Sequence, residues 1–156
     1  MGRTCEPPSN LDACADDGGI AHATTVSVDG RAMLIAGVSG SGKSTLALQM
    51  IALGAGLVSD DRTILTPSPE GPPLASAPPA IAGMIEARGI GILKLPEAGP
   101  ARVAAVVDLD RTETERVPEA RRIRLCGAEV PYLHKVETGS FPAALLVYLR
   151  SGRLEP

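Results

Sequence analysis

A glycine-rich run of eight residues, GVSGSGKS at positions 37–44, matches the pattern G-x-x-x-x-G-K-[ST] at every fixed position. The apolar run Ala32–Gly37 before it predicts a buried strand. The segment Lys43–Gly54 after it carries leucines and other helix formers up to a glycine stop, which predicts a helix. Between a strand and a helix, the N–H groups of such a run surround phosphate oxygens and the helix N-terminus adds partial positive charge. The sequence therefore predicts a nucleotide-binding loop, called the P-loop below, in an α/β fold.

The side chains of the P-loop suit a nucleoside triphosphate with a divalent cation. Lys43 would reach the outer phosphates, and Ser44 would hold Mg²⁺. The candidate nucleotide-binding residues are Gly37, Val38, Ser39, Gly40, Ser41, Gly42, Lys43 and Ser44. The chain lacks the N-K-x-D pattern that reads the base in switch GTPases, and it is too short for a large motor ATPase. A small phosphotransferase remains.

Composition argues against several other functions. The 156 residues give room for one domain. A net charge of −3 and only three aromatic residues, none of them Trp, argue against nucleic-acid binding, because basic surface and stacking platforms are both missing. No run approaches the roughly 18 apolar residues of a membrane span, so no membrane association is expected. The three cysteines have no C-x-x-C spacing, which predicts neither a disulfide framework nor a zinc site and favours a cytoplasmic location.

The remaining pattern predicts a mixed sheet with few helices. Residues 1–19 are poor in hydrophobic residues and predict a flexible N-terminal tail, and residues 20–156 are expected to form one domain. Alternation from His22, followed by Asp29-Gly30, predicts a strand and a hairpin turn before the P-loop strand. The six prolines of Thr66–Pro79 predict a surface loop. Further strands are expected at 57–61, 103–109, 123–126 and 130–136, a charged connection at 111–122 and a helix at 141–150.

Two acidic elements compete for the catalytic role. Asp108 and Asp110 end a hydrophobic run, as the acid of a Walker B strand would, whereas Asp60 and Asp61 end a shorter run. Strand alternation would send Asp60 and Asp61 to opposite sides, so one could meet an acceptor hydroxyl while the other anchors a neighbour such as His22. A plain turn capped by Asp is the alternative for this pair.

Four segments, taken together and in this order, resemble the catalytic domain of the HPr kinase/phosphorylase family. They are His22 fifteen residues before the P-loop, the run GVSGSGKSTLAL, the run GAGLVSDD, and the run GMIEARGIGIL, which resembles the family signature Ile-Glu-x-Arg-Gly-x-Gly. Glu115-Arg116 resembles a later Glu-Arg element of the family. The resemblance covers about residues 21–136.

The resemblance implies an ATP- and Mg²⁺-dependent kinase that phosphorylates a serine of HPr, the phosphocarrier of the sugar phosphotransferase system, or of its nitrogen-branch relative. It also implies a compact P-loop domain with a mixed sheet like that of phosphoenolpyruvate carboxykinase, and a homo-oligomer, a hexamer in the family. By this resemblance Asp60 accepts the serine proton, Lys43 stabilises the transferred phosphoryl group, Ser44 and Glu86 hold Mg²⁺, His22 supports Asp61 or the phosphates, and Arg88 and Arg116 face transition-state charge.

Two departures from the family pattern bear on activity. Full-length members carry an additional N-terminal domain, so this sequence resembles the truncated form found in alphaproteobacteria. Where the family has an arginine-containing segment associated with dephosphorylation, this chain has His134–Ser140 without arginine. We therefore expect weak or absent phosphorylase activity. Two alternatives stay open: a nucleotide-binding regulatory module without phosphotransfer, and a kinase with another acceptor.

Overall fold

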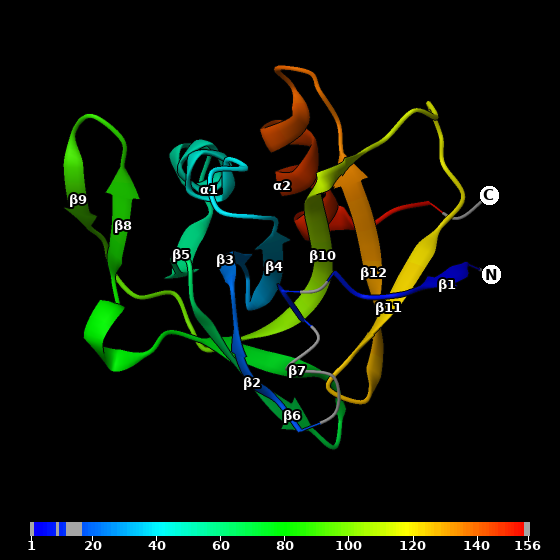
Figure 1. Cartoon of the computed structure of the whole chain (residues 1–156), viewed down its shortest axis with the longest axis horizontal. Coiled ribbons are helices and arrows are strands. Elements are labelled where there is room, and N and C mark those ends of the chain that lie inside the picture. Colours follow the sequence, from blue (N-terminus) through cyan, green and yellow to red (C-terminus); the bar gives the residue numbers. More distant parts are fainter. Residues whose placement is uncertain (1, 9, 12–16, 155–156) are drawn as a thin grey trace.

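The structure is a computed structural model that describes residues 2–8, 10–11 and 17–154. A ten-stranded mixed sheet forms its centre, the two α-helices lie above the sheet, and the hairpin β8–β9 stands to one side (Figure 1). The strands are β1 (Arg3–Cys5), β2 (Gly19–Ala21), β3 (Ala23–Val28), β4 (Arg31–Ala36), β5 (Gly56–Ser59), β6 (Thr63–Ser68), β7 (Gly71–Ser76), β8 (Met84–Ala87), β9 (Gly91–Lys94), β10 (Ala101–Thr112), β11 (Arg121–Leu125) and β12 (Ala128–Lys135). The helices are α1 (Lys43–Ala52), α2 (Phe141–Ser151) and the 3₁₀ helix η2 (Pro79–Ile81). In the described parts of the chain, no helix is long and apolar enough to cross a membrane.

The strand that leads into the P-loop lies inside the sheet. β4 pairs in parallel with β10 on one side and antiparallel with β3 on the other. The predicted hairpin turn between β3 and β4 is confirmed: Asp29 and Gly30 have φ values of 52° and 77°, the positive values that a two-residue turn needs to follow the twist of its strands. The expected α/β fold with a mixed sheet and few helices is therefore confirmed.

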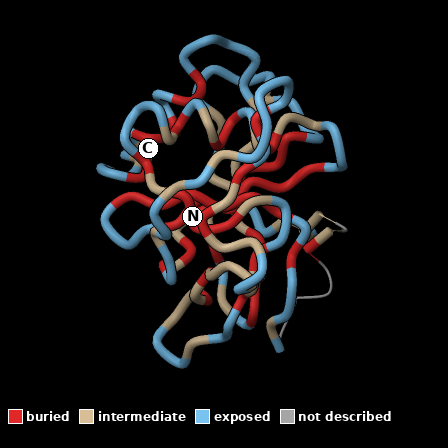
Figure 2. The backbone as a smooth tube through the Cα atoms, turned by 90° about the vertical axis from the view of Figure 1, so that its left-hand side faces the viewer, coloured by how far each residue is buried: buried red, intermediate tan, exposed pale blue. Residues whose placement is uncertain are grey.

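Alternation along β4 feeds a hydrophobic core on each face of the sheet. Met33 and Ile35 belong to the core that includes Met50 of α1 and Leu149 of α2. Leu34 belongs to the core on the other face. Figure 2 shows the buried backbone gathered along the inner strands. Because both faces of β4 are covered, the P-loop starts from a rigid support.

The prediction of a surface loop at Thr66–Pro79 is wrong. This segment forms most of the antiparallel hairpin β6–β7, and η2 follows it. Its prolines are tolerated because Pro67 coincides with a shift in register and Pro72 and Pro73 fall outside the paired positions. Leu65 and Ala75 face each other across the hairpin and are buried, which holds it against the sheet. The prediction gave too much weight to the prolines and therefore missed the two short strands β6 and β7.

The N-terminal segment contacts the domain where a tail was expected. β1 pairs in parallel with β11, from Arg3 opposite Arg121 to Cys5 opposite Ile123. Leu11 is completely buried in the core that contains Leu34. Residues 1, 9 and 12–16 of the expected tail lie outside the described residues. Ordering this polar segment costs conformational entropy, and burial of the Leu11 side chain offsets part of that cost.

Leu11→Ala should lower the free energy of unfolding by about 2–5 kcal/mol, because it removes a fully buried side chain and leaves a cavity. Urea unfolding followed by circular dichroism would measure the change. Leu154→Ala is the matched control, since Leu154 is 94% exposed. Equal unfolding midpoints for the two variants would contradict the packing of the N-terminal segment.

Candidate active site

The P-loop joins the end of β4 to the start of α1 by a tight turn. Gly42 caps the helix with φ of 102°, a left-handed conformation that favours glycine. A Cβ on Gly37 would lie 2.4 Å from the Ser41 hydroxyl, so the two ends of the loop can approach only because residue 37 is glycine. The Ser41 Oγ is buried and has no hydrogen-bond partner among the described residues. An orphaned hydroxyl beside a helix N-terminus is a donor suited to a phosphate oxygen.

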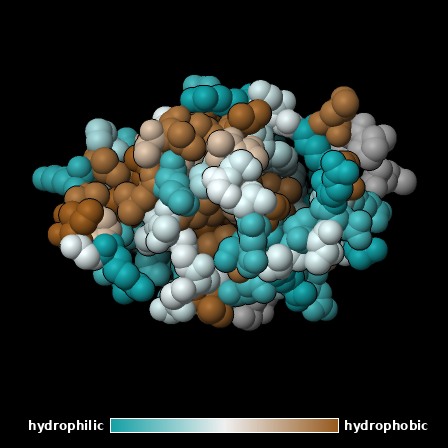
Figure 3. Space-filling view, turned by 90° about the horizontal axis from the view of Figure 1, so that it is seen from above, coloured by the Kyte–Doolittle hydropathy of each residue, from teal (hydrophilic) through white to brown (hydrophobic). Residues whose placement is uncertain are grey.

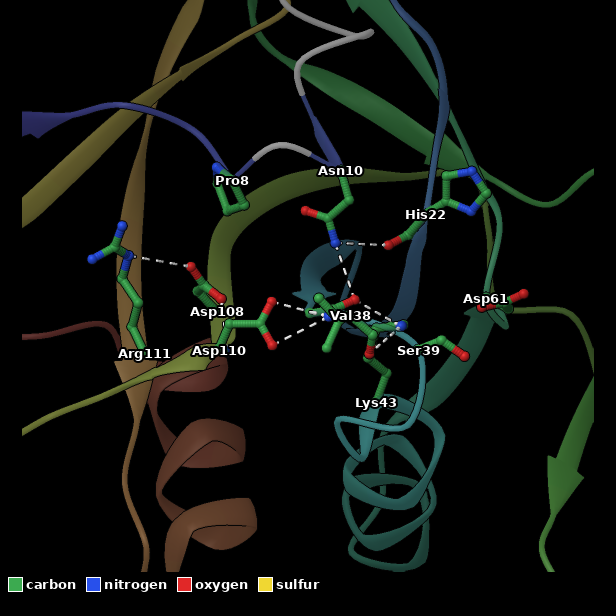
Figure 4. A pocket seen from close by; sticks show the side chains of 11 residues that line it. Pro8, Asn10, His22, Val38, Ser39, Lys43, Asp61, Asp108, Asp110 and Arg111 are labelled. Carbon is green, nitrogen blue, oxygen red and sulfur yellow. Dashed lines mark hydrogen bonds and ion pairs between the residues drawn. The ribbon is translucent and has the colours of Figure 1, made fainter.

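Lys43 lies across the P-loop and not out in solvent. Its ammonium donates to the carbonyl oxygens of Gly37 at 2.8 Å and Val38 at 3.3 Å, and the residue is only 8% exposed (Figure 4). The only cation within the P-loop is thus held against the first two carbonyl groups of the loop.

Asp60 joins three other elements to the turn that follows β5. Its Oδ1 accepts hydrogen bonds from the Ser44 hydroxyl of α1 at 2.6 Å and from the Thr24 hydroxyl of β3 at 3.1 Å. Its Oδ2 accepts the backbone N–H of Glu86 in β8 at 3.1 Å. Asp60 therefore holds the Ser44 hydroxyl in place, as the acidic partner of a P-loop serine does in magnesium sites.

Asp61 differs sharply from its neighbour. Both aspartates lie beyond the end of β5, so the alternation predicted from a strand is wrong for them. The Arg62 N–H donates to the Asp60 carbonyl at 2.8 Å, and Asp61 between them has φ of 66°, which gives the three-residue γ-turn, a strained conformation. The Asp61 N–H is fixed by Thr24 Oγ1 at 3.0 Å, while the Asp61 side chain is exposed. The turn thus aims one carboxylate inward and leaves the next accessible.

Asp108 and Asp110, the other candidate pair of acids, lie near the end of β10 and form hydrogen bonds with the sheet and with the P-loop backbone. Asp108 is 2% exposed, accepts the Tyr132 hydroxyl at 2.5 Å and accepts the Asp110 N–H at 2.9 Å. Burial raises the pKa of Tyr132, and the hydrogen bond to Asp108 raises it further. The Tyr132 hydroxyl therefore keeps the proton that it donates. Asp110 accepts the N–H of Val38. Asp108 is therefore held by hydrogen bonds within the sheet, although it and Asp110 line the same pocket as His22 and Lys43.

Three pockets border the P-loop. One, of about 510 Å³, is lined by His22, Lys43, Asp61 and other residues (Figure 4). A second, of about 390 Å³, brings the P-loop to Asp60, Asp61, Glu86 and Arg88. The structure thus places most of the predicted catalytic residues around one loop. The third, of about 440 Å³, lies between α1 and the start of α2 and includes Lys135 and Glu137.

A cation in the second pocket would draw its ligands from several sources. The described residues hold no group of three or more His, Cys, Asp or Glu side chains that could bind a metal. The Ser44 hydroxyl, the Asp60 carboxylate and the Glu86 carboxylate are oxygen donors of the kind that Mg²⁺ prefers, and Mg²⁺ completes its shell with water and phosphate oxygens. The residues present fit such a cation.

Arg116 lies apart from this site. It lines a separate pocket of about 610 Å³ together with Glu113, Arg121 and Tyr148. Arg121 donates to Glu113 at 2.7 Å, and this hydrogen bond lowers the pKa of Glu113 to about 2. The structure therefore does not bring Arg116 to the P-loop.

Two polar residues at the site have no motif that would reveal them. Thr24 lies in the strand predicted by the alternation from His22, and its hydroxyl contacts both Asp60 and Asp61. Asn10 belongs to the expected tail, yet its amide reaches the carbonyl of Gly37. Both contacts join segments that are distant in sequence, so neither leaves a local signal.

Thr24→Val should lower the free energy of unfolding by about 1–3 kcal/mol and weaken Mg·ATP binding, because it leaves Asp60 short of a donor and the Asp61 N–H without an acceptor. Thr25→Val is the matched control. Thr25 is equally buried, and its hydroxyl bonds to Thr63, away from the P-loop. Urea unfolding and isothermal titration would separate the two variants. Equal loss of Mg·ATP affinity in both would contradict the role of Thr24.

Comparisons with known proteins identify the family of this chain. The family model described as "HPr Serine kinase C-terminal domain" matches residues 17–109. An HPr kinase/phosphorylase of Geobacillus kaustophilus is 33% identical over 124 residues, which are 72% of this chain and 40% of the relative. One of Clostridium botulinum is 43% identical over 72 residues, 46% of this chain and 23% of the relative. This chain thus spans less than half the length of these curated relatives.

A solved structure supports the same assignment. The "Hpr(Ser) kinase/phosphatase" of Coxiella burnetii superposes with a TM-score of 0.69 at 25% identity, and the match covers 84% of this chain and 93% of that chain. The matched family region contains the P-loop, both aspartates after β5 and the hairpin with Glu86 and Arg88. This chain therefore belongs to the HPr kinase family and resembles its C-terminal domain.

Proposed function

We propose that this chain is an ATP- and Mg²⁺-dependent protein serine kinase whose acceptor is an HPr-like phosphocarrier, with residues 20–156 as its catalytic domain and the N-terminal segment packed onto that domain. The observation that carries the proposal is the pair after β5: Asp60 binds the Ser44 hydroxyl at 2.6 Å, while the adjacent Asp61 is exposed beside the P-loop. A module that only binds nucleotide needs the first carboxylate. A kinase also needs the second, to receive the proton of the acceptor hydroxyl.

The P-loop supplies the donors for the phosphates. The N–H groups at the start of α1, the orphaned Ser41 hydroxyl and the Lys43 ammonium all belong to this loop and the first turn of its helix. Lys43 would exchange its carbonyl partners for phosphate oxygens and stabilise charge on the transferred group. Ser44 and Glu86 would hold Mg²⁺, which supplies neutralisation of phosphate charge when bound, and Asp60 would fix the Ser44 hydroxyl through its hydrogen bond.

Asp61, and not Asp60, is the better general base. All three hydrogen bonds to Asp60 point its oxygens at Ser44, Thr24 and the Glu86 N–H, so they are committed to holding the site together. The Asp61 carboxylate has no such partner among the described residues and shares a pocket with His22 and Lys43. It would take the proton from the attacking serine oxygen. His22 and Arg88 stand at the rims of the two pockets, where they can steer the acceptor or its charge.

The surface beside the site suits a protein acceptor. Ile90 and Ile92 of the β8–β9 hairpin are 80% and 64% exposed, and Ile92 pairs across the hairpin with Glu86. From above, hydrophobic surface gathers on the side of the molecule where β8 and β9 lie (Figure 3). An apolar edge next to the transfer site offers area to a folded protein and little to a small metabolite. A cytoplasmic location remains a prediction from the cysteine pattern, and a hexamer remains a prediction of the family resemblance.

Asp61→Asn should lower serine phosphorylation by about 10²–10⁴ while Mg·ATP affinity stays within a few-fold, because the amide fits the same turn and cannot accept the proton. Asp60→Asn should instead weaken Mg·ATP binding, since the carboxylate beside Ser44 loses its charge. Labelled ATP, Mg²⁺ and HPr would be used, with phosphoserine mapping and a separate binding titration. An active Asp61→Asn with an inactive Asp60→Asn would assign the base to Asp60. Wild-type protein that binds Mg·ATP and leaves serine unmodified would be a regulatory module.

The reverse reaction should be weak. Attack of phosphate on phosphoserine brings two anions together, and their repulsion must be offset by nearby cations. The segment His134–Ser140 reaches the pocket between α1 and α2, where Lys135 is the one cation among the lining residues and Glu137 opposes it. Given serine-phosphorylated HPr and millimolar phosphate, the protein should release pyrophosphate at least about tenfold more slowly than it phosphorylates HPr. Comparable rates would require cations from another source.

A further inference from the structure

One peptide group of the P-loop is held from both sides by residues outside the motif. The carbonyl of Gly37 accepts the Asn10 side-chain amide at 3.1 Å as well as the Lys43 ammonium at 2.8 Å. The N–H of the same peptide group, on Val38, donates to both carboxylate oxygens of Asp110 at 3.0 and 3.2 Å. Figure 4 shows Asn10 and Asp110 approaching this peptide from different elements.

Both residues have further contacts, although Asp110 is exposed and Asn10 is half-buried. Asn10 precedes Leu11, whose side chain is completely buried, and the Asn10 amide also reaches the His22 carbonyl at 3.4 Å. Asp110 lies near the end of β10, and its N–H donates to Asp108, which the Tyr132 hydroxyl fixes in turn. Both residues fall outside the region 17–109 that matches the family model.

Packing alone would not orient this peptide group. Gly37 has no side chain, and Val38 is 64% exposed, so neither residue anchors the peptide by burial. Its two hydrogen-bonding groups therefore set its orientation, and each has a partner from a separate part of the fold. The carbonyl partner gains importance when Lys43 turns to phosphate, because Gly37 is buried and an unpaired buried carbonyl is costly.

We propose that Asn10 and Asp110 are positioning residues that hold the Gly37–Val38 peptide group, and with it the entrance of the P-loop, ready for the phosphates. The proposal rests on the proposed nucleotide binding. Asn10 keeps the Gly37 carbonyl paired when Lys43 leaves it, and Asp110 keeps the Val38 N–H turned away from the phosphate site. Preorganisation of this kind raises affinity by lowering the cost of ordering on binding.

The charge of Asp110 allows a sharp test. A carboxylate beside a phosphate site repels the ligand, whereas its hydrogen bond to Val38 favours binding. Asp110→Asn keeps an acceptor and removes the charge, and Asp110→Ala removes both. We expect Asp110→Ala to weaken Mg·ATP binding about tenfold, the worth of a hydrogen bond to a charged group. Asp110→Asn should bind within about threefold of wild type or more tightly, and this rescue would not follow from a merely structural role.

The carbonyl side has its own variants. Asn10→Ala should weaken Mg·ATP binding about fivefold, the worth of a neutral hydrogen bond. Asn10→Asp should do no better, because a carboxylate cannot donate to Gly37. The fold-loss of Mg·ATP affinity in the double variant Asn10→Ala/Asp110→Ala should be smaller than the product of the fold-losses in the two single variants, because both hydrogen bonds hold the same peptide group. Glu6→Ala, in the same segment, and Glu70→Ala, in the β6–β7 turn, are controls on exposed residues and should bind as wild type does.

A readout that needs no nucleotide separates this proposal from the proposed function. NMR of the ligand-free protein would report the chemical shift of the Val38 amide proton. This signal should lie downfield in the wild type. It should move upfield in Asp110→Ala and much less in Asp110→Asn. Tighter Mg·ATP binding by both Asp110 variants, or a Val38 signal that does not respond to Asp110→Ala, would overturn the proposal. Wild-type protein that fails to bind Mg·ATP would overturn the proposed function, and the Val38 signal would then decide whether the peptide is held as described.

Discussion

The Asp60 carboxylate accepts hydrogen bonds from a side chain of α1, a side chain of β3 and the backbone of β8, and the geometry of the site depends on these three bonds. Each donor comes from a different part of the chain, so the carboxylate sets where these parts meet. It places Ser44 at the head of α1, Glu86 on the hairpin, and the turn that presents Asp61. Loss of this acceptor would leave three donors partly unpaired, which is more costly than loss of one surface bond.

Local patterns in the sequence were enough to predict the parts of the site that are contiguous. The strand and the helix that flank the glycine-rich run, and the turn at Asp29-Gly30, each depend on residues within a few positions of one another, and the structure confirms them. The hairpin β6–β7 could not be found in this way, because its prolines suggest a loop and only the long-range pairing shows that they avoid the ladder. The roles of Thr24 and Asn10 could not be predicted for a related reason. Their partners, Asp60 and Gly37, are far away in sequence.

At the two adjacent aspartates, the side chains are separated as predicted, but by a different backbone geometry from the one predicted. Alternation along a strand predicted that Asp60 and Asp61 would face opposite sides, and the structure does separate their surroundings. The separation comes from a strained three-residue turn after the strand ends, held by the Thr24 hydroxyl. Aspartate tolerates the left-handed conformation better than most residues, so the turn and the chemistry favour the same residue type. The sequence alone does not reveal which aspartate is tied down.

Hydrogen bonds are distributed unequally between the two sides of the site, and this suits transfer between a small donor and a large acceptor. On the phosphate side, the P-loop is fixed by a rigid strand, by Asp110 and by the N-terminal segment, so its donors need little rearrangement when phosphate binds. On the acceptor side, Asp61, Arg88 and Ile92 are exposed on a turn and a projecting hairpin. Under the proposed function, a protein acceptor would bring one serine to the phosphoryl group and then leave, and exposed groups can adjust to its surface at each encounter. The fixed hydrogen bonds would then lie where charge develops, and the exposed side chains where the partner would dock.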